Sequence, residues 1–219
     1  MRILLIFPPT TIYGDDPSVP PVVQPLGLAY LAAWLEKDGH EVSILDGRGS
    51  RDDKTQIGNS IRYGLSDEKI LREIDDYSPD IIGISNMWTA YSGDPHRIAK
   101  SIKEKYPSLK IIFGGSHPSE FPELVLKDPN VDLVVAGEGE ITFSKILRNL
   151  EKKQPIDEIH GIAYRTEDGV IKTHCGSCNC GIQDPDSIVR VPFYKNYQML
   201  MARITTTTYP NALLTTRLP

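Results

Sequence analysis

The sequence predicts an α/β protein built on an open, doubly wound, parallel sheet of five strands, followed by a C-terminal β-hairpin and an extended tail. Three observations lead to this prediction. Five short apolar runs recur within the first 137 residues, helical segments lie between them, and the pattern changes after residue 155. Strands and helices that alternate in this way form a parallel sheet wrapped by helices.

The five predicted strands are rich in Ile, Val and Leu and show little polar alternation, which is typical of strands covered on both faces. They are RILLIF (2–7), EVSILD (41–46), DIIGIS (80–85), KIIFGG (110–115) and VDLVVAG (131–137). Right-handed crossovers predict the strand order 2-1-3-4-5, a Rossmann-like arrangement of the flavodoxin-like kind.

The predicted helices are the segments whose apolar residues recur at helical spacing. They are 25–39, 66–77, 94–107 and 139–153, with a shorter candidate at 118–129. The first places an apolar stripe on one face and ends at Gly39. Ser66 is the predicted N-cap of the second, and the acidic residues after it favour a helix N-terminus.

The chain divides into a predicted Rossmann-like domain, 1–153, and a second part, 154–219. The second part begins with a hairpin signal, two strand-like runs around Glu167, Asp168 and Gly169. The remainder has no sustained period and resembles a connector toward another domain.

Composition excludes several classes of partner. A net charge of −5 and a pI near 5.6 argue against a nucleic-acid-binding surface. No run approaches the roughly 18 apolar residues that span a bilayer, and no signal peptide precedes the first strand, so no membrane partner and a cytoplasmic location are expected.

Residues that directly follow the predicted strands are candidate ligand contacts, because ligands of such sheets bind beyond the carboxyl ends of the strands. A proline-stiffened, structureless loop of about 17 residues follows the first strand, a length more typical of functional than of idle loops. It offers Pro9, Thr10 and Thr11, although a rigid surface loop is the alternative. Asp46 ends the second strand, where it meets a ligand or caps a turn.

The later strand ends carry small and polar residues. Ser85, Asn86 and Trp88 follow the third strand, and Trp88 either lines the rim or covers the sheet. Gly114 and Gly115 permit close approach of the backbone after the fourth strand. Ser116 and His117 come next, and a Gly-Glu-Gly-Glu step over 137–140 ends the fifth strand.

The Gly-Glu-Gly-Glu step has two interpretations. The carboxylates either cap the following helix or accept hydrogen bonds from amide donors of a ligand. They oppose a phosphate site, and the phosphate-binding fingerprints GxGxxG and GxxxxGK[ST] are not found at the first strand–helix turn. The sequence therefore predicts a large ligand rich in amides or hydroxyls.

The motifs RILLIFPP…PLGLAYLAAWLEKDGHEVSILD, PDIIGIS, IIFGGSHPSEFPE and DLVVAGEGEITF resemble the N-terminal cobalamin-binding domain of radical S-adenosylmethionine (SAM) enzymes. That group includes magnesium-protoporphyrin cyclases and cobalamin-dependent methyltransferases. The resemblance is strong over residues 1–150 and weaker over 156–219. It implies cobalamin as the cofactor of this chain, with SAM and a 4Fe-4S cluster in the full-length parent.

The resemblance also implies how cobalamin is held. Better-known cobalamin domains carry D-x-H-x-x-G after the second strand, and the His is the lower cobalt ligand. Here Asp46 and Gly47 are followed by Arg48 at the His position. Arginine stays protonated and cannot ligate a metal, so cobalamin is expected base-off without a His ligand.

The other cofactor contacts follow from the same resemblance. A segment aligned with the S-x-L motif, two glycine positions and the Gly-Glu-Gly step are expected to line the slot for the nucleotide tail. His117 is an off-pattern candidate near the corrin ring or cobalt. The implied cofactor contacts are Pro9, Thr10, Thr11, Asp46, Gly47, Arg48, Ser85, Asn86, Met87, Gly114, Gly115, Ser116, His117, Gly137, Glu138 and Gly139.

The resemblance leaves the activity of the chain open. Where the radical enzymes carry three cluster-binding cysteines, this chain reads LLTTRLP and has no C-x-x-x-C-x-x-C. Residues 154–219 are thus expected to lead toward a radical SAM domain that the chain does not contain. The alternatives are a stand-alone corrinoid carrier or sensor, and an interaction domain that binds no corrinoid.

Three cysteines, Cys175, Cys178 and Cys180, lie within six residues beside His174. Such a local, odd-numbered cluster does not resemble a disulfide framework. Its thiols are either reduced loop residues or ligands of zinc or an iron–sulfur cluster that is completed from elsewhere.

Overall fold

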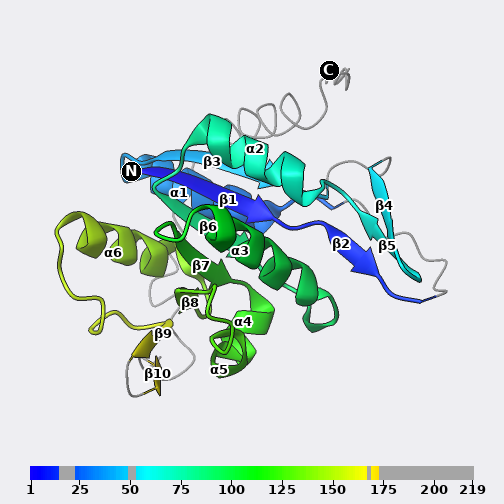
Figure 1. Ribbon diagram of the computed structural model, residues 1–219. Coiled ribbons are helices and arrows are strands. Elements are labelled where there is room, and N and C mark those ends of the chain that lie inside the picture. The colour runs from blue at the N-terminus through cyan, green and yellow to red at the C-terminus, as the bar shows by residue number, and fades with distance from the viewer. Residues whose placement is uncertain (15–22, 49–52, 167–168, 173–219) are drawn as a thin grey trace, which may run out of the picture.

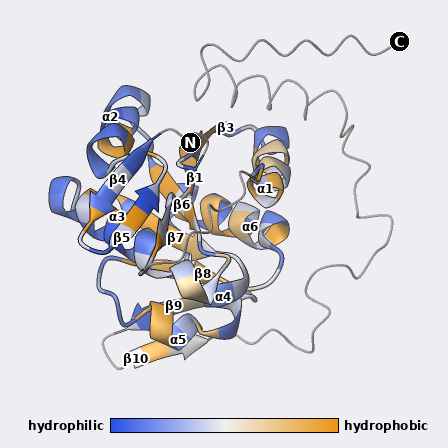
Figure 2. Ribbon diagram, turned by 90° about the vertical axis from the view of Figure 1, so that its right-hand side faces the viewer, coloured by the Kyte–Doolittle hydropathy of each residue, from blue (hydrophilic) through white to orange (hydrophobic). Residues whose placement is uncertain are grey.

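A computed structural model describes residues 1–14, 23–48, 53–166 and 169–172. They form three layers, with a central sheet between two pairs of helices (Figures 1 and 2). The cysteine cluster at 175–180 lies outside the described residues.

The central sheet has seven strands in the order β10-β9-β8-β7-β6-β1-β3. Their bounds are β1 Arg2–Phe7, β3 Glu41–Asp46, β6 Ile81–Ser85, β7 Lys110–Gly114, β8 Leu133–Val135, β9 Ile162–Thr166 and β10 Gly169–Lys172. The five predicted strands are parallel and lie in the predicted order, so the fold class is confirmed. The β9–β10 hairpin pairs antiparallel with β8 and widens the sheet, while the division of the chain at residue 153 stays a prediction.

Four long helices cover the sheet, α1 and α6 on one face and α2 and α3 on the other (Figure 2). The helical elements are α1 Leu26–Lys37, α2 Asp67–Tyr77, η1 Thr89–Tyr91, α3 Gly93–Lys105, α4 Ser116–Glu120, α5 Pro122–Val125 and α6 Gly139–Glu151. The predicted N-cap of α2 is confirmed, because the hydroxyl of Ser66 accepts a hydrogen bond from the amide of Lys69 at 3.3 Å.

Two hydrophobic cores follow from the alternation of side chains along each strand. In β1, Ile3 and Leu5 pack under α1 and α6, whereas Leu4 and Ile6 pack under α2 and α3. These side chains are almost fully buried, which explains the uninterrupted apolar run in the sequence.

A second, three-stranded antiparallel sheet lies beyond the carboxyl end of β1 (Figure 1). It consists of β2 Thr10–Ile12, β5 Ser60–Tyr63 and β4 Lys54–Ile57, in that order. The prediction that the whole loop after the first strand lacks structure is therefore wrong for 10–12. Its three residues form a strand only because they pair with β5, which lies about fifty positions along the chain, and such pairing leaves no local signal.

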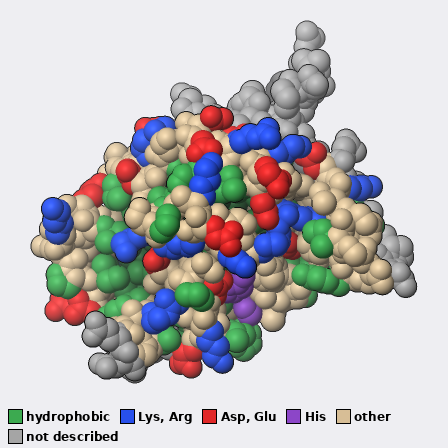
Figure 3. Space-filling model, viewed as in Figure 1, with side chains coloured by type: hydrophobic (Ala, Val, Ile, Leu, Met, Phe, Trp, Pro, Cys, Tyr) green, Lys and Arg blue, Asp and Glu red, His purple; other side chains and the backbone are tan. Residues whose placement is uncertain are grey.

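The surface over α2 and α3 carries both signs of charge. Basic and acidic side chains are intermixed on this face (Figure 3), and Lys105 on α3 pairs with Asp75 on α2. Within the described ranges, no helix has the length and apolar content that crossing a membrane requires.

Candidate functional site

A cavity of about 490 Å³ opens at the carboxyl edge of the sheet. Its floor comes from the ends of β1, β6, β7 and β8, and its walls come from the first turns of α1 and α6. Apolar side chains dominate the lining. They include Leu5, Phe7, Leu28, Leu31, Ile112, Val135 and Phe143.

Glycines create the space in this cavity. A Cβ atom added at Gly114 or Gly139 would find its nearest neighbour 3.9 Å away, and one added at Gly137 would meet nothing within 4 Å. Gly137 also has φ +78°, a conformation that favours glycine. Larger residues at these positions would extend side chains into open space, so the glycines keep room for a ligand.

Two carboxylates stand at the rim of the cavity, Glu138 and Glu140. Glu138 is the N-cap residue of α6 but makes no side-chain capping hydrogen bond. Burial raises the pKa of the Glu140 carboxyl, and Glu138 adds to that shift. Both carboxylates therefore suit a ligand that donates hydrogen bonds better than they suit an anion.

A smaller cleft lies beside the cavity and shares four wall residues with it, namely Phe7, Ser85, Met87 and Trp88. We call it the Arg48 cleft. Its remaining lining comes from Pro8, Pro9, Thr10, Arg48, Asn86, Tyr91 and Pro95.

Arg48 is buried between two aromatic rings. Its guanidinium carbon lies 5.4 Å from the ring centre of Phe7 and 5.2 Å from that of Trp88, distances at which a cation is attracted to a ring face. Burial lowers the pKa of Arg48, while Asp46, Tyr91 and Asp94 act in the opposite direction. The backbone amide of Arg48 donates to Asp46 at 3.0 Å, so Asp46 caps its own turn, one of the two expected roles.

Asn86 carries an unsatisfied amide. The residue is 1% exposed, and neither Oδ1 nor Nδ2 has a hydrogen-bond partner among the described residues. Its backbone is fully engaged, because its amide donates to Gly114 at 2.8 Å and its carbonyl accepts from His117 at 3.2 Å. A buried amide without partners is costly to the fold, so Asn86 points to a ligand or water in the Arg48 cleft.

His117 belongs to the support of the site. It is buried, its Nδ1 lies 3.0 Å from the hydroxyl of Thr89, and its ring packs against Phe121. Burial lowers the pKa of His117, and His96 adds to the effect. Gly115 has φ +113°, and an added Cβ would lie 2.9 Å from the carbonyl oxygen of Asn86, so this glycine is required for close approach of the two loops.

The structure brings most of the sequence-predicted contacts together in two groups. Those that line the large cavity are Ser85, Met87, Gly114, Gly115, Ser116, Gly137, Glu138 and Gly139. Those that line the Arg48 cleft are Pro9, Thr10, Arg48 and Asn86, again with Ser85 and Met87. The remaining four, Thr11, Asp46, Gly47 and His117, are buried behind these walls.

Sequence reasoning missed the contribution of α1 to the site. Residues 23–28 and Leu31 form one wall of the cavity, and Gly83 forms part of its floor. The signal was the apolar first turn of the helix, where Leu26 stays 47% exposed. As for a metal site, the described part of the chain holds no group of three or more His, Cys, Asp or Glu side chains that could bind an ion.

The protein class follows from this geometry together with the family comparison. The B12 binding domain family matches residues 17–147, so the chain belongs to that family, and the predicted resemblance is confirmed.

Within this family, the chain is similar to a methyltransferase and to a cyclase. The chain is 38% identical over 175 residues to cytidylyl-2-hydroxyethylphosphonate methyltransferase of Streptomyces wedmorensis, a match that covers 78% of this chain and 32% of that protein. It is 30% identical over 177 residues to anaerobic magnesium-protoporphyrin IX monomethyl ester cyclase of Synechocystis sp., which covers 79% and 32%. The chain thus spans about a third of the length of these curated relatives.

Solved structures show the same fold. The radical SAM methyltransferase TsrM from Kitasatospora setae, solved with cobalamin and a 4Fe-4S cluster, superposes with a TM-score of 0.61 at 22% identity over 78% of this chain and 28% of its own. The cobalamin-dependent radical SAM enzyme OxsB, solved with aqua-cobalamin and SAM, gives 0.59 at 23% identity over 81% and 22%.

Proposed function

We propose that this chain binds cobalamin, base-off and without a His lower ligand, as the cofactor domain of a radical SAM methyltransferase or oxidative cyclase. The observation that carries the proposal is the cavity at the carboxyl edge of the sheet, in a chain of the B12 binding domain family. Open α/β sheets bind their ligands at this edge, near the point where the strand order reverses between β1 and β6.

The residues present fit the chemistry of cobalamin. The corrin ring is edged with primary amides, which both donate and accept hydrogen bonds. Glu138 and Glu140 can accept from amide N–H groups, and the unsatisfied amide of Asn86 offers one acceptor and two donors. The apolar cavity and its glycines would hold the nucleotide tail, for which burial of a flat aromatic base is favourable.

The lower face of the ring is the side on which this chain departs from the His-bearing domains. Arg48 occupies the sequence position of the His and is buried between Phe7 and Trp88. Its guanidinium can neither lose a proton at neutral pH nor donate an electron pair to cobalt. The domain would therefore bind cobalamin without supplying a protein ligand from this position.

When bound, cobalamin supplies a cobalt centre that carries an alkyl group or an electron. The residues of this chain would bind the cofactor, keep water from its buried tail and orient its ring toward a substrate. SAM, a 4Fe-4S cluster and the substrate would be held by a downstream radical SAM domain. The radical SAM enzymes TsrM and OxsB, which share this fold, support this because they are solved with a 4Fe-4S cluster and with SAM, respectively.

Titration with hydroxocobalamin tests the proposal. We expect a stoichiometric, non-dialysable complex whose absorption spectrum is of the base-off kind. A protein that stays colourless would overturn the proposal and favour an interaction domain.

Substitution of Arg48 tests the ligation state. Arg48→Ala should retain cobalamin, whereas Arg48→His places an imidazole where other cobalamin domains have one. We expect nitrogen coupling in the electron paramagnetic resonance (EPR) spectrum of cob(II)alamin bound to Arg48→His and none in wild type. Nitrogen coupling in wild type that persists in Arg48→Ala would show another ligand from the protein.

A further inference from the structure

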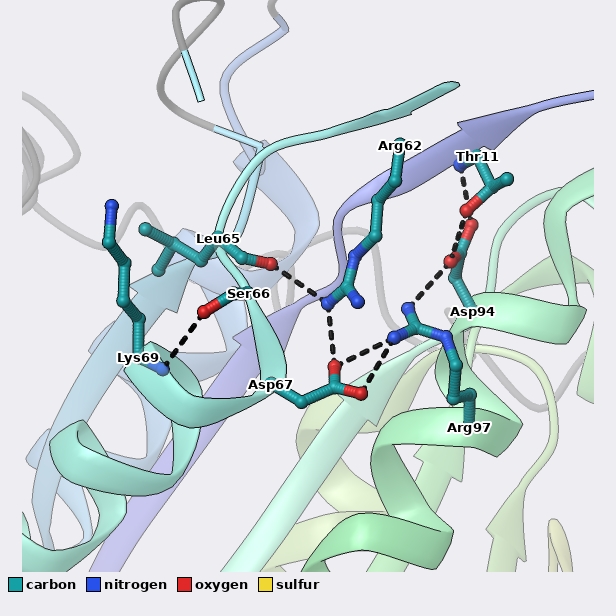
Figure 4. Close-up of polar contacts among 8 residues, drawn as sticks. All are labelled: Thr11, Arg62, Leu65, Ser66, Asp67, Lys69, Asp94 and Arg97. Atoms are coloured by element: carbon teal, nitrogen blue, oxygen red, sulfur yellow. Dashed lines mark hydrogen bonds and ion pairs between the residues drawn. The ribbon is translucent and has the colours of Figure 1, made fainter. Parts of the chain in front are cut away.

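Four charged side chains, Arg62, Asp67, Arg97 and Asp94, form a row of ion pairs between the three-stranded sheet and the helices α2 and α3 (Figure 4). We call this row the ion-pair chain. Arg62 on β5 donates to Asp67 at 2.6 Å, and Arg97 on α3 donates to both oxygens of Asp67 at 2.7 and 2.8 Å. Arg97 also donates to Asp94 at 2.7 Å. Asp94 in turn accepts from the backbone amide and the hydroxyl of Thr11 on β2, at 2.6 and 2.7 Å.

The two ends of this ion-pair chain are costly to bury, whereas the side chains of Asp67 and Arg97 between them are 25% and 32% exposed. Asp94 is 2% exposed and Arg62 is 5% exposed. Removing charges from water is unfavourable, and well-packed apolar residues often stabilise a fold as well as or better than a buried ion pair does. The better-attested benefit of buried ionic groups is a single, specified arrangement of the segments that they join.

The segments joined here are those that surround Arg48. Thr10 and Pro95, which line the Arg48 cleft, directly adjoin Thr11 and Asp94 in the sequence. The ion-pair chain therefore holds two walls of that cleft against each other through Asp94.

The segment that carries Arg48 forms a third wall of the cleft, and backbone hydrogen bonds connect it to Arg62. Arg62 donates to the carbonyl oxygen of Leu65 at 2.8 Å, and the amide of Leu65 donates to the carbonyl oxygen of Gly47 at 2.8 Å. Gly47 in turn donates to the carbonyl oxygen of Phe7 at 2.7 Å. A continuous path of hydrogen bonds thus leads from Asp94 to the residue that precedes Arg48.

We propose that Asp94, Arg97, Asp67 and Arg62 are positioning residues that hold Arg48 against Trp88 at the edge of the corrinoid site. The effect on the cofactor rests on the proposed function above, whereas the placement of Arg48 does not. None of the four lines either cavity, so they act through Arg48 rather than by touching the cofactor.

Two variants interrupt the ion-pair chain at its Asp94 end. Asp94→Asn removes the charge that Arg97 faces, and Thr11→Val removes the hydroxyl that donates to Asp94 while it preserves shape. Thr11→Ser retains that hydroxyl and is the conservative counterpart. The matched control is Asp75→Asn, because Asp75 and Lys105 also join α2 to α3, at an exposed site.

Fluorescence of Trp88 reports the position of Arg48 without any cofactor. Trp34 is the other tryptophan, so Trp34→Phe leaves Trp88 as the sole emitter. Arg48→Ala gives the level of acrylamide quenching that Trp88 shows when its contact with the Arg48 guanidinium is lost. Trp88 is already 41% exposed, so the change is bounded by full exposure. We expect Asp94→Asn and Thr11→Val to raise acrylamide quenching of Trp88 to the level of Arg48→Ala. Thr11→Ser and Asp75→Asn should match the parent.

EPR of bound cob(II)alamin reports the consequence for the cofactor. Added imidazole should ligate cobalt at about two- to tenfold lower concentration in Asp94→Asn and Thr11→Val than in wild type. If these variants lose thermal stability yet retain wild-type Trp88 quenching, the network is only structural and the inference is overturned. If wild type binds no cobalamin, the proposed function fails, and the quenching experiment still decides whether the network places Arg48.

Discussion

The large cavity and the Arg48 cleft are built in different ways. The large cavity is apolar and owes its volume to glycines at the ends of β7 and β8 and at the start of α6. The Arg48 cleft is narrow, lined by a cation, three aromatic rings and an amide, and flanked by a partly buried network of charges.

The large cavity provides volume for a ligand, whereas the Arg48 cleft fixes the positions of particular side chains. A cavity made by glycines needs no particular side-chain geometry, so its occupant is selected by size and polarity. A cleft built around a buried arginine needs its groups at fixed places, and the ion-pair chain supplies that order. Substitutions in the cavity should therefore change affinity with little effect on stability, and substitutions around the cleft should affect stability first.

The largest expected effect comes from Gly64→Ala, behind the Arg48 cleft. Gly64 has φ +111°, and an added Cβ would lie 2.0 Å from the carbonyl oxygen of Gly47. We expect the free energy of unfolding to fall by about 3 kcal/mol, from backbone strain and overpacking together. Urea denaturation measures this. Gly58→Ala is the matched control, since Gly58 also has positive φ, +59°, but an added Cβ meets nothing within 4 Å. Equal losses in both variants would contradict a special contact at Gly64.

The next effect is expected from Gly114→Leu in the large cavity. The added side chain enters space that a ligand would fill, so cobalamin affinity should fall about 100-fold, equivalent to the cost of displacing or overpacking a bound group. Equilibrium titration measures the change. Gly114→Ala should lose far less, because its Cβ has no neighbour closer than 3.9 Å. A Leu variant with wild-type affinity would place the ligand elsewhere.

Asn86→Leu should separate binding from stability within the cleft itself. Leucine has a similar volume and removes the two unsatisfied polar atoms, so the free energy of unfolding without cofactor should rise by about 1–3 kcal/mol. Cobalamin affinity should fall about tenfold through the lost hydrogen bonds. Chemical denaturation and titration on the same sample measure both. A less stable variant would mean that the fold itself satisfies this amide.

The smallest effect is expected from Glu140→Gln at the cavity rim. Burial raises the pKa of Glu140 from its ordinary value of 4.5, so the folded chain holds the proton more tightly than the unfolded chain. The stabilisation from the protonated form is complete below 4.5 and is lost as the pH rises through the raised pKa. Glu140→Gln should therefore melt about 1–2 °C higher at neutral pH and no higher at acidic pH, a small change because the group is only half-buried. Thermal melts across pH measure it, with the exposed Glu123→Gln as control.

The amino-acid sequence by itself determined the five parallel strands of the sheet, the helices between them and the edge at which the cavity opens. The five apolar runs are local signals, and strands buried on both faces cannot tolerate polar residues, so β1, β3, β6, β7 and β8 were readable. Ser66 caps the N-terminus of α2 through a contact with the amide of Lys69, three residues away, which a local pattern can reveal.

Only the tertiary structure decided the division of the site into a cavity and a cleft. The pairing of β2 with β5 and the contact of Thr11 with Asp94 join residues about 50 and 83 positions apart, and neither leaves a mark in the sequence between them. Thr11, predicted as a ligand contact, donates its hydroxyl to Asp94 for the same reason. Local sequence patterns indicate which secondary structure a segment prefers. The partner of a buried polar group is instead set by the packing of segments that are distant in the sequence. Such a partner is needed because a buried polar group without a hydrogen bond destabilises the fold.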